Sequence, residues 1–344
     1  MGGWDSRQRF RDALDEFSRE TNYDDFQSKL WALSVELTPT TLYRYRSCTP
    51  RDLSNLKSEL LPFTSPEVFK DDTEDAFIKA EDSDYDRMTE LATGLLFPLF
   101  DRLSNMSPQQ CSEEFCKVFR PFDVRNDLFA GMIPEDAENQ SALLSESEKK
   151  DRIREIVADA CSQIARDDTQ NALRRQVRVA CLCENPDSPA MWDRYADGSR
   201  GFQLEYQRED LLGMGRRWMS APLLFPVIYD SLRPSMSELA MMLALRGFDS
   251  WLATGADPLK ISVFVGVLRA LYTKDATRFS HEEEWRVIMP DPTINEESRK
   301  FAVRMCPCRR IRLGENISDV DGEAIREIAE NLPVPVPVLE FGEE

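Results

Sequence analysis

The sequence predicts an α+β fold: a mixed, mostly antiparallel split sheet with flanking helices and a helical N-terminal extension. Three observations predict it. Apolar residues recur at helical spacing near the N-terminus. Short runs rich in β-branched and aromatic residues lie both early and late in the chain. A long stretch of helical pattern separates the early runs from the late ones.

The domain organisation follows from the same patterns. We expect residues 1–40 to form the helical extension, and residues 41–344 to form one α+β domain. A helical insertion is expected at about 84–170. Within the extension, residues 5–20 and 23–37 each place apolar side chains along one stripe of a helix.

The remaining elements are expected in this order. Alternating or apolar β-forming runs predict strands. Amphipathic spacing predicts helices, the last with Ser318 as N-cap and Asp321 three positions later. A Pro-interrupted run at the C-terminus predicts a sheet edge. The expected strands are 41–47, the start of 61–75, 177–183, 202–206, 223–230, 284–289, 301–305, 309–313 and 334–341, and the expected helices are 50–60, 84–119, 146–168, 234–248, 256–272 and 318–331.

Composition sets limits on partners and location. The chain of 344 residues carries a formal net charge of −19, which repels a phosphate backbone and argues against direct nucleic-acid binding. The N-terminus lacks the apolar core of a secretory signal, and no apolar run is long enough to span a bilayer. We therefore expect a cytoplasmic protein without membrane association.

Eight cysteines include two Cys-x-Cys pairs, Cys181/Cys183 and Cys306/Cys308. Four thiolates could bind zinc if the two pairs met. The first pair lies in an apolar, strand-like run, so we expect reduced thiols at alternate core positions and no metal site.

Candidate catalytic side chains are most closely spaced in the segment from Lys274 to Pro290. Glu282, Glu283 and Glu284 run directly into an apolar strand pattern, and the only histidine, His281, precedes them. If the strand begins at Glu282, then Glu282 and Glu284 share one face and Glu283 points to the other. Paired carboxylates at this spacing can perturb each other's pKa or share a ligand.

A second candidate lies in the strand at 41–47. Tyr43 and Tyr45 would face one side of it, and Arg44 and Arg46 the other. Two guanidinium groups on one face suit phosphate or carboxylate, although solvated surface charges explain the same pattern.

Common catalytic motifs are missing from the sequence. There is no P-loop, GxGxxG, GxSxG or HExxH pattern. A single histidine argues against most triad hydrolases and His-ligated metalloenzymes.

Four segments, taken together, resemble a widespread bacterial family, domain of unknown function 2971. They are LYRYRS (42–47), LPFTSPEVFKDDTE (61–74), MWDRYADGSRGFQLEY (191–206) and EEEWRVI (282–288). The resemblance covers roughly residues 41–340. The MW-x-x-YA-x-x-x-x-GF and ExEWR pieces are its most specific parts.

More distantly, the same pieces resemble ADP-ribosyltransferase folds, which carry an Arg or His on a first strand, a Ser/Thr on a second and a Glu-x-Glu motif on a late one. The resemblance implies NAD as substrate, cleaved at the nicotinamide–ribose bond. Glu284 would stabilise the oxocarbenium-like transition state and Glu282 would position or deprotonate the acceptor. The cofactor-binding residues would be Arg44, Tyr43, Tyr45, and Thr64 or Ser65.

The resemblance implies a toxin or anti-phage effector acting on a protein or other acceptor. The alternative is a non-catalytic module that binds a nucleotide or a protein. Glu284 could equally form a structural ion pair with Arg286 two residues later. For Trp192 and Tyr195 we expect core packing, and for Lys274 a solvated helix terminus.

Overall fold

A computed structural model of the chain describes residues 3–18, 20, 22–66, 145, 147–148, 151, 177–214, 223–230, 261–290 and 301–343. Two compact units divide the chain. The first comprises Met1–Ala76, Leu173–Leu232 and Leu271–Glu344, and the second Phe77–Ala172 and Arg233–Ala270. The predicted helical insertion at 84–170 lies almost entirely outside the described residues, and the predicted helix at 234–248 lies wholly outside them.

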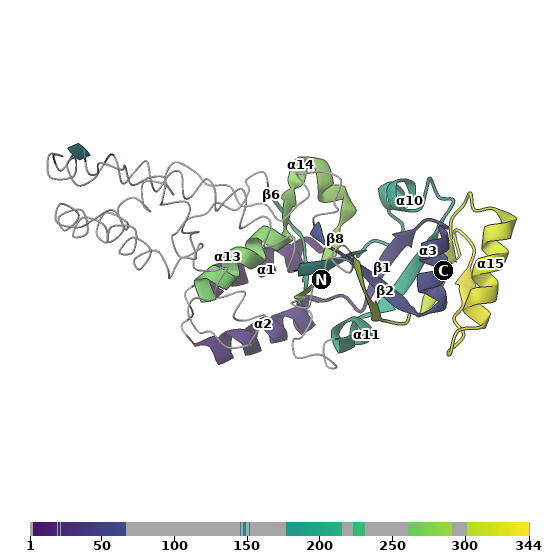
Figure 1. Cartoon of the computed structure of the whole chain (residues 1–344), viewed down its shortest axis with the longest axis horizontal. Helices are drawn as coiled ribbons and strands as arrows, with labels where there is room; N and C mark the ends of the chain where they lie inside the picture. The colour runs from purple at the N-terminus through teal and green to yellow at the C-terminus, as the bar shows by residue number, and fades with distance from the viewer. Residues whose placement is uncertain are drawn as a thin grey trace, which may run out of the picture. The chain divides into compact units, whose positions relative to one another are not determined.

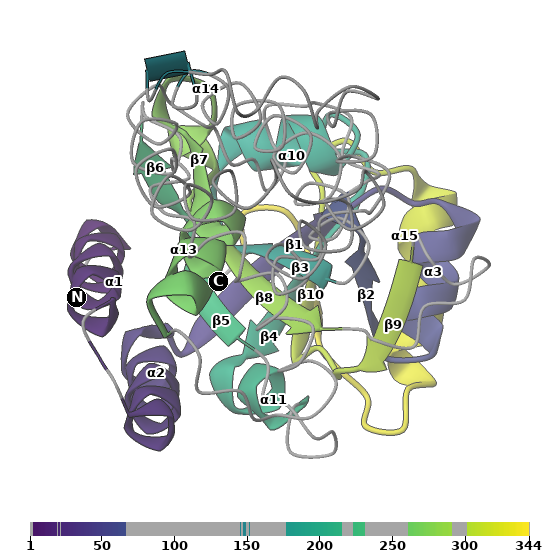
Figure 2. The ribbon, with the colours of Figure 1, turned by 60° about the vertical axis from the view of Figure 1, so that its left-hand side comes forward.

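The first unit begins with two helices, α1 (Gly3–Phe17) and α2 (Tyr23–Leu37), as predicted. The side chain of Asn22 caps α2 by accepting hydrogen bonds from two backbone amides of its first turn. Phe10 on α1 stacks on Phe225, and Ser34 on α2 donates a 2.9 Å hydrogen bond to the carbonyl of Leu224. The helices therefore pack against the edge of the sheet at residues 224–225 (Figure 2).

The sheet confirms the predicted mixed, mostly antiparallel architecture. Among the described residues it has nine strands. Every pairing in it is antiparallel except that between its last two strands by sequence. Its main order is β11 (Val338–Leu339), β10 (Arg310–Leu313), β4 (Phe202–Gln207), β1 (Thr41–Arg46), β3 (Val177–Cys183), β2 (Leu60–Thr64) and β9 (Phe301–Met305), while β8 (Glu284–Pro290) pairs with β3 and with β5 (Leu223–Pro226). Figure 1 labels β1, β2 and β8 of this sheet, and Figure 2 labels every strand of it except β11.

The split in the sheet arises at β3. One edge of β3 pairs with β8 along its whole length. The other edge is shared, because β1 meets it at Cys183 and β2 meets it at Val179. β1 continues instead along β4, to which it is paired from Thr41 to Arg46. The strands β1 and β2 therefore diverge, and the gap between them opens beside β3.

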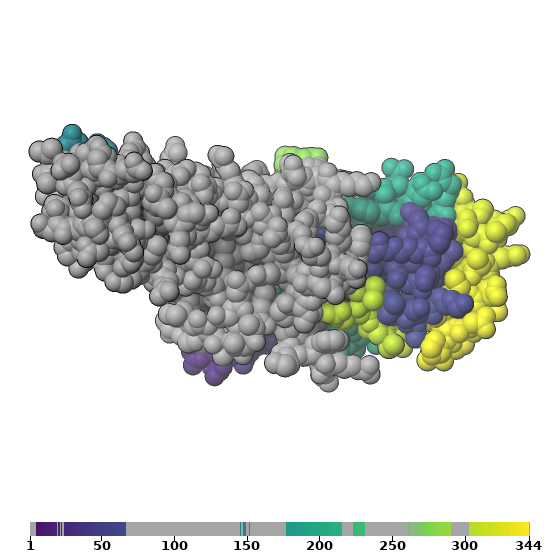
Figure 3. Space-filling view, viewed as in Figure 1, coloured from purple at the N-terminus to yellow at the C-terminus, as the bar shows by residue number. Residues whose placement is uncertain are grey.

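Short helices with regular caps surround the sheet. α3 (Pro50–Lys57) begins with Pro50 after the cap residue Thr49, and α15 (Asp319–Glu330) begins after Ser318, as its sequence predicted. These two helices lie next to each other at the surface (Figure 3). Of the other short helices, α10 (Pro189–Tyr195) begins after the cap residue Ser188, whereas α11 (Arg208–Gly213) has no side-chain cap.

The strand predicted over 223–230 is in fact two strands. β5 ends at Pro226, and β6 (Ile228–Asp230) leaves the main sheet to pair in parallel with β7 (Thr273–Asp275). Between them, the amide of Val227 donates to the carbonyl of Glu284. β7 follows α13 (Ile261–Tyr272), the described end of the helix predicted over 256–272, and leads into the short helix α14 (Ala276–Phe279).

A tight loop joins α10 to β4. Asp197, Gly198 and Ser199 all have positive φ, which is costly for the two residues with side chains. At Gly201 a Cβ atom would lie 2.0 Å from the carbonyl oxygen of Arg46, so only glycine fits there. No helix among the described residues has the length and apolar character needed to cross a bilayer.

Candidate functional site

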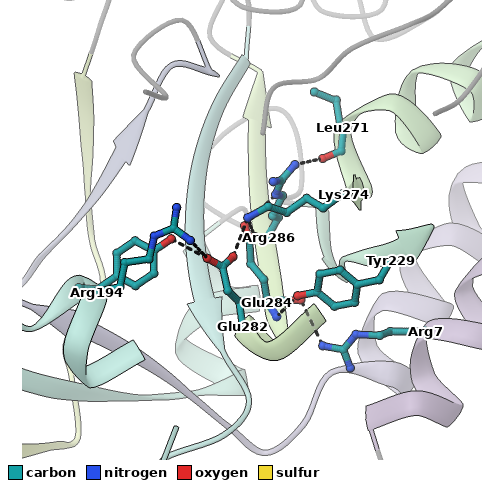
Figure 4. Close-up of polar contacts among 9 residues, drawn as sticks. Arg7, Arg194, Tyr229, Leu271, Lys274, Glu282, Glu284 and Arg286 are labelled. Atoms are coloured by element: carbon teal, nitrogen blue, oxygen red, sulfur yellow. Dashed lines mark hydrogen bonds and ion pairs between the residues drawn. The ribbon is translucent and has the colours of Figure 1, made fainter. Parts of the chain in front are cut away.

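A buried lysine joins the two carboxylates of the Glu-x-Glu motif. The Nζ atom of Lys274 lies 2.6 Å from Oε2 of Glu282 and 2.8 Å from Oε2 of Glu284 (Figure 4). None of the three side chains is more than 4% exposed. Charges this deeply buried need partners, and here each has at least one.

The chain brings the two carboxylates together by a turn and not by strand alternation. The strand expected over 284–289 begins at Glu284, so the alternative in which it begins at Glu282 does not hold. Residues Ser280–Glu282 form a 3₁₀ turn, Glu283 has a left-handed backbone with φ 45°, and the strand starts at Glu284. The turn brings Glu282 close to the start of β8, so that the carboxylates of Glu282 and Glu284 both contact the ammonium group of Lys274. Glu283 is half-buried, and His281 is exposed.

Glu284 is also paired with Arg286, the partner considered from the sequence. Nε of Arg286 donates a 2.8 Å hydrogen bond to Oε1 of Glu284, and its Nη1 donates to the carbonyl of Leu271. Burial alone would raise the pKa of Glu284. The charges of Arg286 and Lys274 outweigh burial and hold that pKa well below its usual range. Glu284 is therefore ionised at neutral pH.

Glu282 has two further partners, which lie on α10. Its Oε1 accepts a 2.9 Å hydrogen bond from the hydroxyl of Tyr195, and Nη1 of Arg194 lies 3.2 Å away. Both partners come from the end of α10. The Arg194 side chain is 44% exposed, so α10 connects the buried network to solvent. Burial, with the charge of Glu282, raises the pKa of Tyr195, and the hydroxyl remains a donor.

The expectation of a solvated Lys274 is wrong, because Lys274 lies on β7 and is only 4% exposed. Its Nζ also lies 4.4 Å from the ring centroid of Phe279. Burial disfavours the charged amine, but Glu284 and Glu282 outweigh it and raise the pKa of Lys274. The sequence holds little signal for this role, because Lys274 stands at the end of an apolar run and is followed directly by the charged Asp275.

A pocket of about 180 Å³ lies against this network. The residues that line it come from β1, the end of β2, β3, α10, β7, the 3₁₀ turn Ser280–Glu282 and the start of β8. They are Tyr43, Arg44, Tyr45, Arg46, Thr64, Val179, Cys181, Leu182, Met191, Tyr195, Lys274, Glu282, Glu284 and Arg286.

The register of the sheet divides the predicted residues of β1 between two faces. Tyr43 is opposite Cys183, which is opposite Glu284. Cross-strand partners point to the same side, so Tyr43 and Tyr45 share the face of Glu284, and Arg44 and Arg46 belong to the other face. The predicted alternation along the strand is confirmed. Residues of both sets line the pocket.

Arg44 is buried without a full set of partners. It is 7% exposed, and its Nη1 has no hydrogen-bond partner among the residues that the structure describes. Burial and the neighbouring charge of Arg46 lower the pKa of Arg44 to about 9, so it stays protonated at neutral pH. Nε of Arg46 lies 3.7 Å from Oδ1 of Asp52 on α3. The expectation of plain solvated surface charges does not fit this degree of burial.

Of the other predicted residues, some line the pocket and some are buried beside it. Thr64 lines the pocket at the end of β2, and Ser65 directly after it is fully buried. Trp192 is buried against Tyr45, as predicted for core packing, whereas Tyr195 is 37% exposed and lines the pocket. The role of α10 in holding Glu282 was not foreseen.

The cysteine pairs are reduced in the described structure. Cys183, Cys306 and Cys308 are buried, and Cys181 lines the pocket, where burial and Glu284 raise the pKa of its thiol to about 12. Among the described residues, no group of three or more His, Cys, Asp or Glu side chains is placed to hold a metal ion.

Comparison with known proteins finds no matching family model, no matching curated protein and no matching solved structure. The resemblance to domain of unknown function 2971 and the more distant one to ADP-ribosyltransferases therefore stay predictions. The geometry of the pocket is the remaining guide to function.

Proposed function

We propose that the pocket binds a nucleotide, with the phosphate groups toward Arg44 and Arg46 and the sugar toward Glu282 and Glu284. The observation that carries this proposal is the buried guanidinium of Arg44, a residue that lines the pocket and whose Nη1 has no hydrogen-bond partner among the described residues. A buried charge without a counter-charge is costly, and an anionic ligand would offset that cost. Guanidinium groups are well suited to phosphate.

The charge of the pocket supports an anionic ligand. Its lining carries four basic side chains, Arg44, Arg46, Lys274 and Arg286, against two carboxylates, Glu282 and Glu284. The whole chain has a formal net charge of −19. A locally basic pocket in an acidic protein would attract a small anion while the rest of the surface repels large polyanions.

The pocket also offers groups for a sugar and a ring. Each carboxylate oxygen has more than one lone pair, so Glu282 and Glu284 can accept hydrogen bonds from ribose hydroxyls as well as from Lys274. Tyr43, Tyr45 and Tyr195 provide aromatic surface. The volume of about 180 Å³ is below the roughly 300–1,000 Å³ of most ligand pockets, so the described walls would enclose part of a nucleotide.

Calorimetry with ADP, NAD and uncharged adenosine tests this proposal. We expect ADP and NAD to bind and adenosine to bind at least about tenfold more weakly, because it lacks the phosphate. An R44Q variant should lose most of the affinity for ADP while its Tm stays the same or rises. R200Q is the matched control, since Arg200 is exposed and pairs with Asp197 outside the pocket. Absence of binding by the wild type, or unchanged binding by R44Q, would contradict the proposal.

A second proposal is that the bound nucleotide is NAD and that the protein cleaves it as an ADP-ribosyltransferase. The observation that favours it is that Glu284 is held ionised at the pocket wall. A fixed carboxylate can stabilise the positive charge that develops on the ribose as nicotinamide leaves. Glu282, which pairs with the more exposed Arg194, would then position an incoming acceptor. Two ion pairs on Glu284 weaken it as a proton acceptor, so its role would be electrostatic.

Incubation with NAD labelled in the nicotinamide ring, with and without cell lysate, tests the second proposal. We expect released nicotinamide from the wild type and almost none from E284Q, which keeps the shape of the side chain but not its charge. If NAD binds by calorimetry and no nicotinamide appears under either condition, the protein is a binding module and the second proposal fails alone.

A further inference from the structure

The N-terminal helix α1 reaches the turn that carries the two carboxylates. Arg7 on α1 is 6% exposed. Its Nη1 lies 2.9 Å from Oε1 of Glu184. Its Nη2 donates a 3.4 Å hydrogen bond to the backbone carbonyl of Glu284 (Figure 4). A side chain near the start of the chain thus touches the backbone of a pocket residue without touching the pocket itself.

Glu184 connects Arg7 to both neighbours of Glu284. Its backbone amide donates a 3.2 Å hydrogen bond to the carbonyl of Glu283. Its Oε2 accepts a 2.7 Å hydrogen bond from the indole nitrogen of Trp285. Arg7 pairs with the carboxylate that accepts from Trp285, so the ion pair and the two hydrogen bonds of Glu184 form one partly buried unit.

Tyr229 completes the support from the other side. Its hydroxyl accepts a 2.8 Å hydrogen bond from the amide of Glu284, and Cζ of Arg7 lies 5.5 Å from the centre of its ring. Arg11, one helical turn after Arg7, donates to the carbonyl of Tyr229 and pairs with Asp230. Through Arg7 and Arg11, α1 therefore contacts Glu184, Tyr229 and Asp230, which lie around the turn.

We propose that Arg7 is a positioning residue of the candidate site, which fixes the turn at Glu283 from which Glu282 and Glu284 both reach Lys274. Glu283 has φ 45°, a conformation that a residue with a side chain adopts only when its surroundings hold it there. Arg7, Glu184 and Tyr229 are those surroundings. Without Arg7, the turn can relax and the two carboxylates move apart.

The chemical reactivity of Lys274 reports on this turn without any ligand. Lys274 is 4% exposed and held by both carboxylates, so an amine-acetylating reagent should modify it slowly. Lys57 on α3 is exposed and serves as an internal reference in the same sample. Mass spectrometry of the full-length protein gives the acetylation rate of Lys274 relative to that of Lys57.

We expect R7A and E184Q each to raise the relative acetylation rate of Lys274 at least about fivefold, and R7K to lie between them and the wild type. R9A is the matched control, because Arg9 lies on the same helix but pairs with Glu36 on α2. Amide hydrogen exchange in β4 should be the same in all variants, which would show that the fold is intact. If R7A does not fold, the acetylation rates of Lys274 in R7K and E184Q test the inference.

Two results would overturn the inference. One is an unchanged Lys274 rate in R7A and E184Q, or in R7K and E184Q where R7A does not fold. The other is an equal rise in R9A, which would show that any loosening of α1 suffices. The inference concerns the site of the proposed function, but its failure is separable from failure of that function. Reactivity of Lys274 tests the positioning alone, and calorimetry with ADP tests the binding alone.

Discussion

Lys274 and Glu284 form an ion pair in which Nζ lies 2.8 Å from Oε2 and both side chains are only 4% exposed. The pair joins β7, from the small parallel sheet, to the first residue of β8 in the main sheet. A contact of this kind contributes to the fold and to the charge of the pocket at once. Its removal should therefore be visible in stability as well as in binding.

The variant K274M should be strongly destabilised, by about 3–5 kcal/mol in the free energy of unfolding. It leaves Glu282 and Glu284 close together without the ammonium group that separates them. Urea denaturation measures the change. K57M, at an exposed position, should alter stability by less than about 0.5 kcal/mol. A similarly small loss in K274M would show that the network contributes little to folding.

The double variant K274M/E284Q should be more stable than the sum of the two single changes predicts. Removing both partners leaves fewer uncompensated charges than removing one. A double-mutant cycle by urea denaturation measures this coupling. Strict additivity would mean that the two side chains do not interact in solution.

Stability should fall in acid more steeply in the wild type than in E284Q. The folded protein holds the pKa of Glu284 below its ordinary value of 4.5. The stabilisation from this group is therefore complete above pH 4.5 and is lost as the pH falls toward the folded pKa. Unfolding free energies measured from neutral pH down into strong acid test this, with E284Q expected to start lower and to vary less. Parallel curves for the two proteins would contradict the assigned direction.

The variant Y195F should bind nucleotide differently while keeping its fold. It removes the hydroxyl that donates to Glu282 at 2.9 Å and leaves the ring in place. We expect a loss of about 0.5–1.5 kcal/mol in stability, the usual net value of one hydrogen bond. Nucleotide affinity should also change, because Tyr195 lines the pocket. Calorimetry measures the nucleotide affinity of Y195F, with Y23F, a change in α2, as the control.

A G201A variant should fold poorly. The added Cβ would lie 2.0 Å from the carbonyl oxygen of Arg46, which belongs to the backbone of β1 and has little freedom to move. We expect a loss of at least about 2 kcal/mol in the free energy of unfolding. G213A, at the end of α11, is the matched control. No atom of the described residues lies within 4 Å of the position that its methyl group would take, so this change should be neutral or slightly stabilising.

Local sequence patterns predicted most of the fold. The helix over 23–37, the strand over 177–183 and the cap at Ser318 depend on spacing and on neighbouring residues, and the structure has all three. The break between β5 and β6 was missed, although Pro226, at which β5 ends, is a local sign of it within LLFPVIYD. The first strand ends where Val227 donates its hydrogen bond to Glu284, a residue far along the chain.

The site was less accessible to sequence reasoning than the fold. Glu282, Glu284 and Arg286 stand within five residues and were found together. Lys274 and Tyr195 were not, because a lysine before a short helix and a tyrosine at a helix end have many ordinary explanations. The partnership with Glu282 depends on a left-handed residue at Glu283, and a glutamate gives no local sign of that conformation.

The four charges of the buried network have a consequence for how the sequence can vary. Two carboxylates, one ammonium and one guanidinium sum to zero, so the group can be buried as a set. Loss of any single member leaves a net charge in the interior. In related chains, positions 274, 282, 284 and 286 should thus be retained together or replaced together, and a substitution at one of them should be accompanied by a compensating change at another.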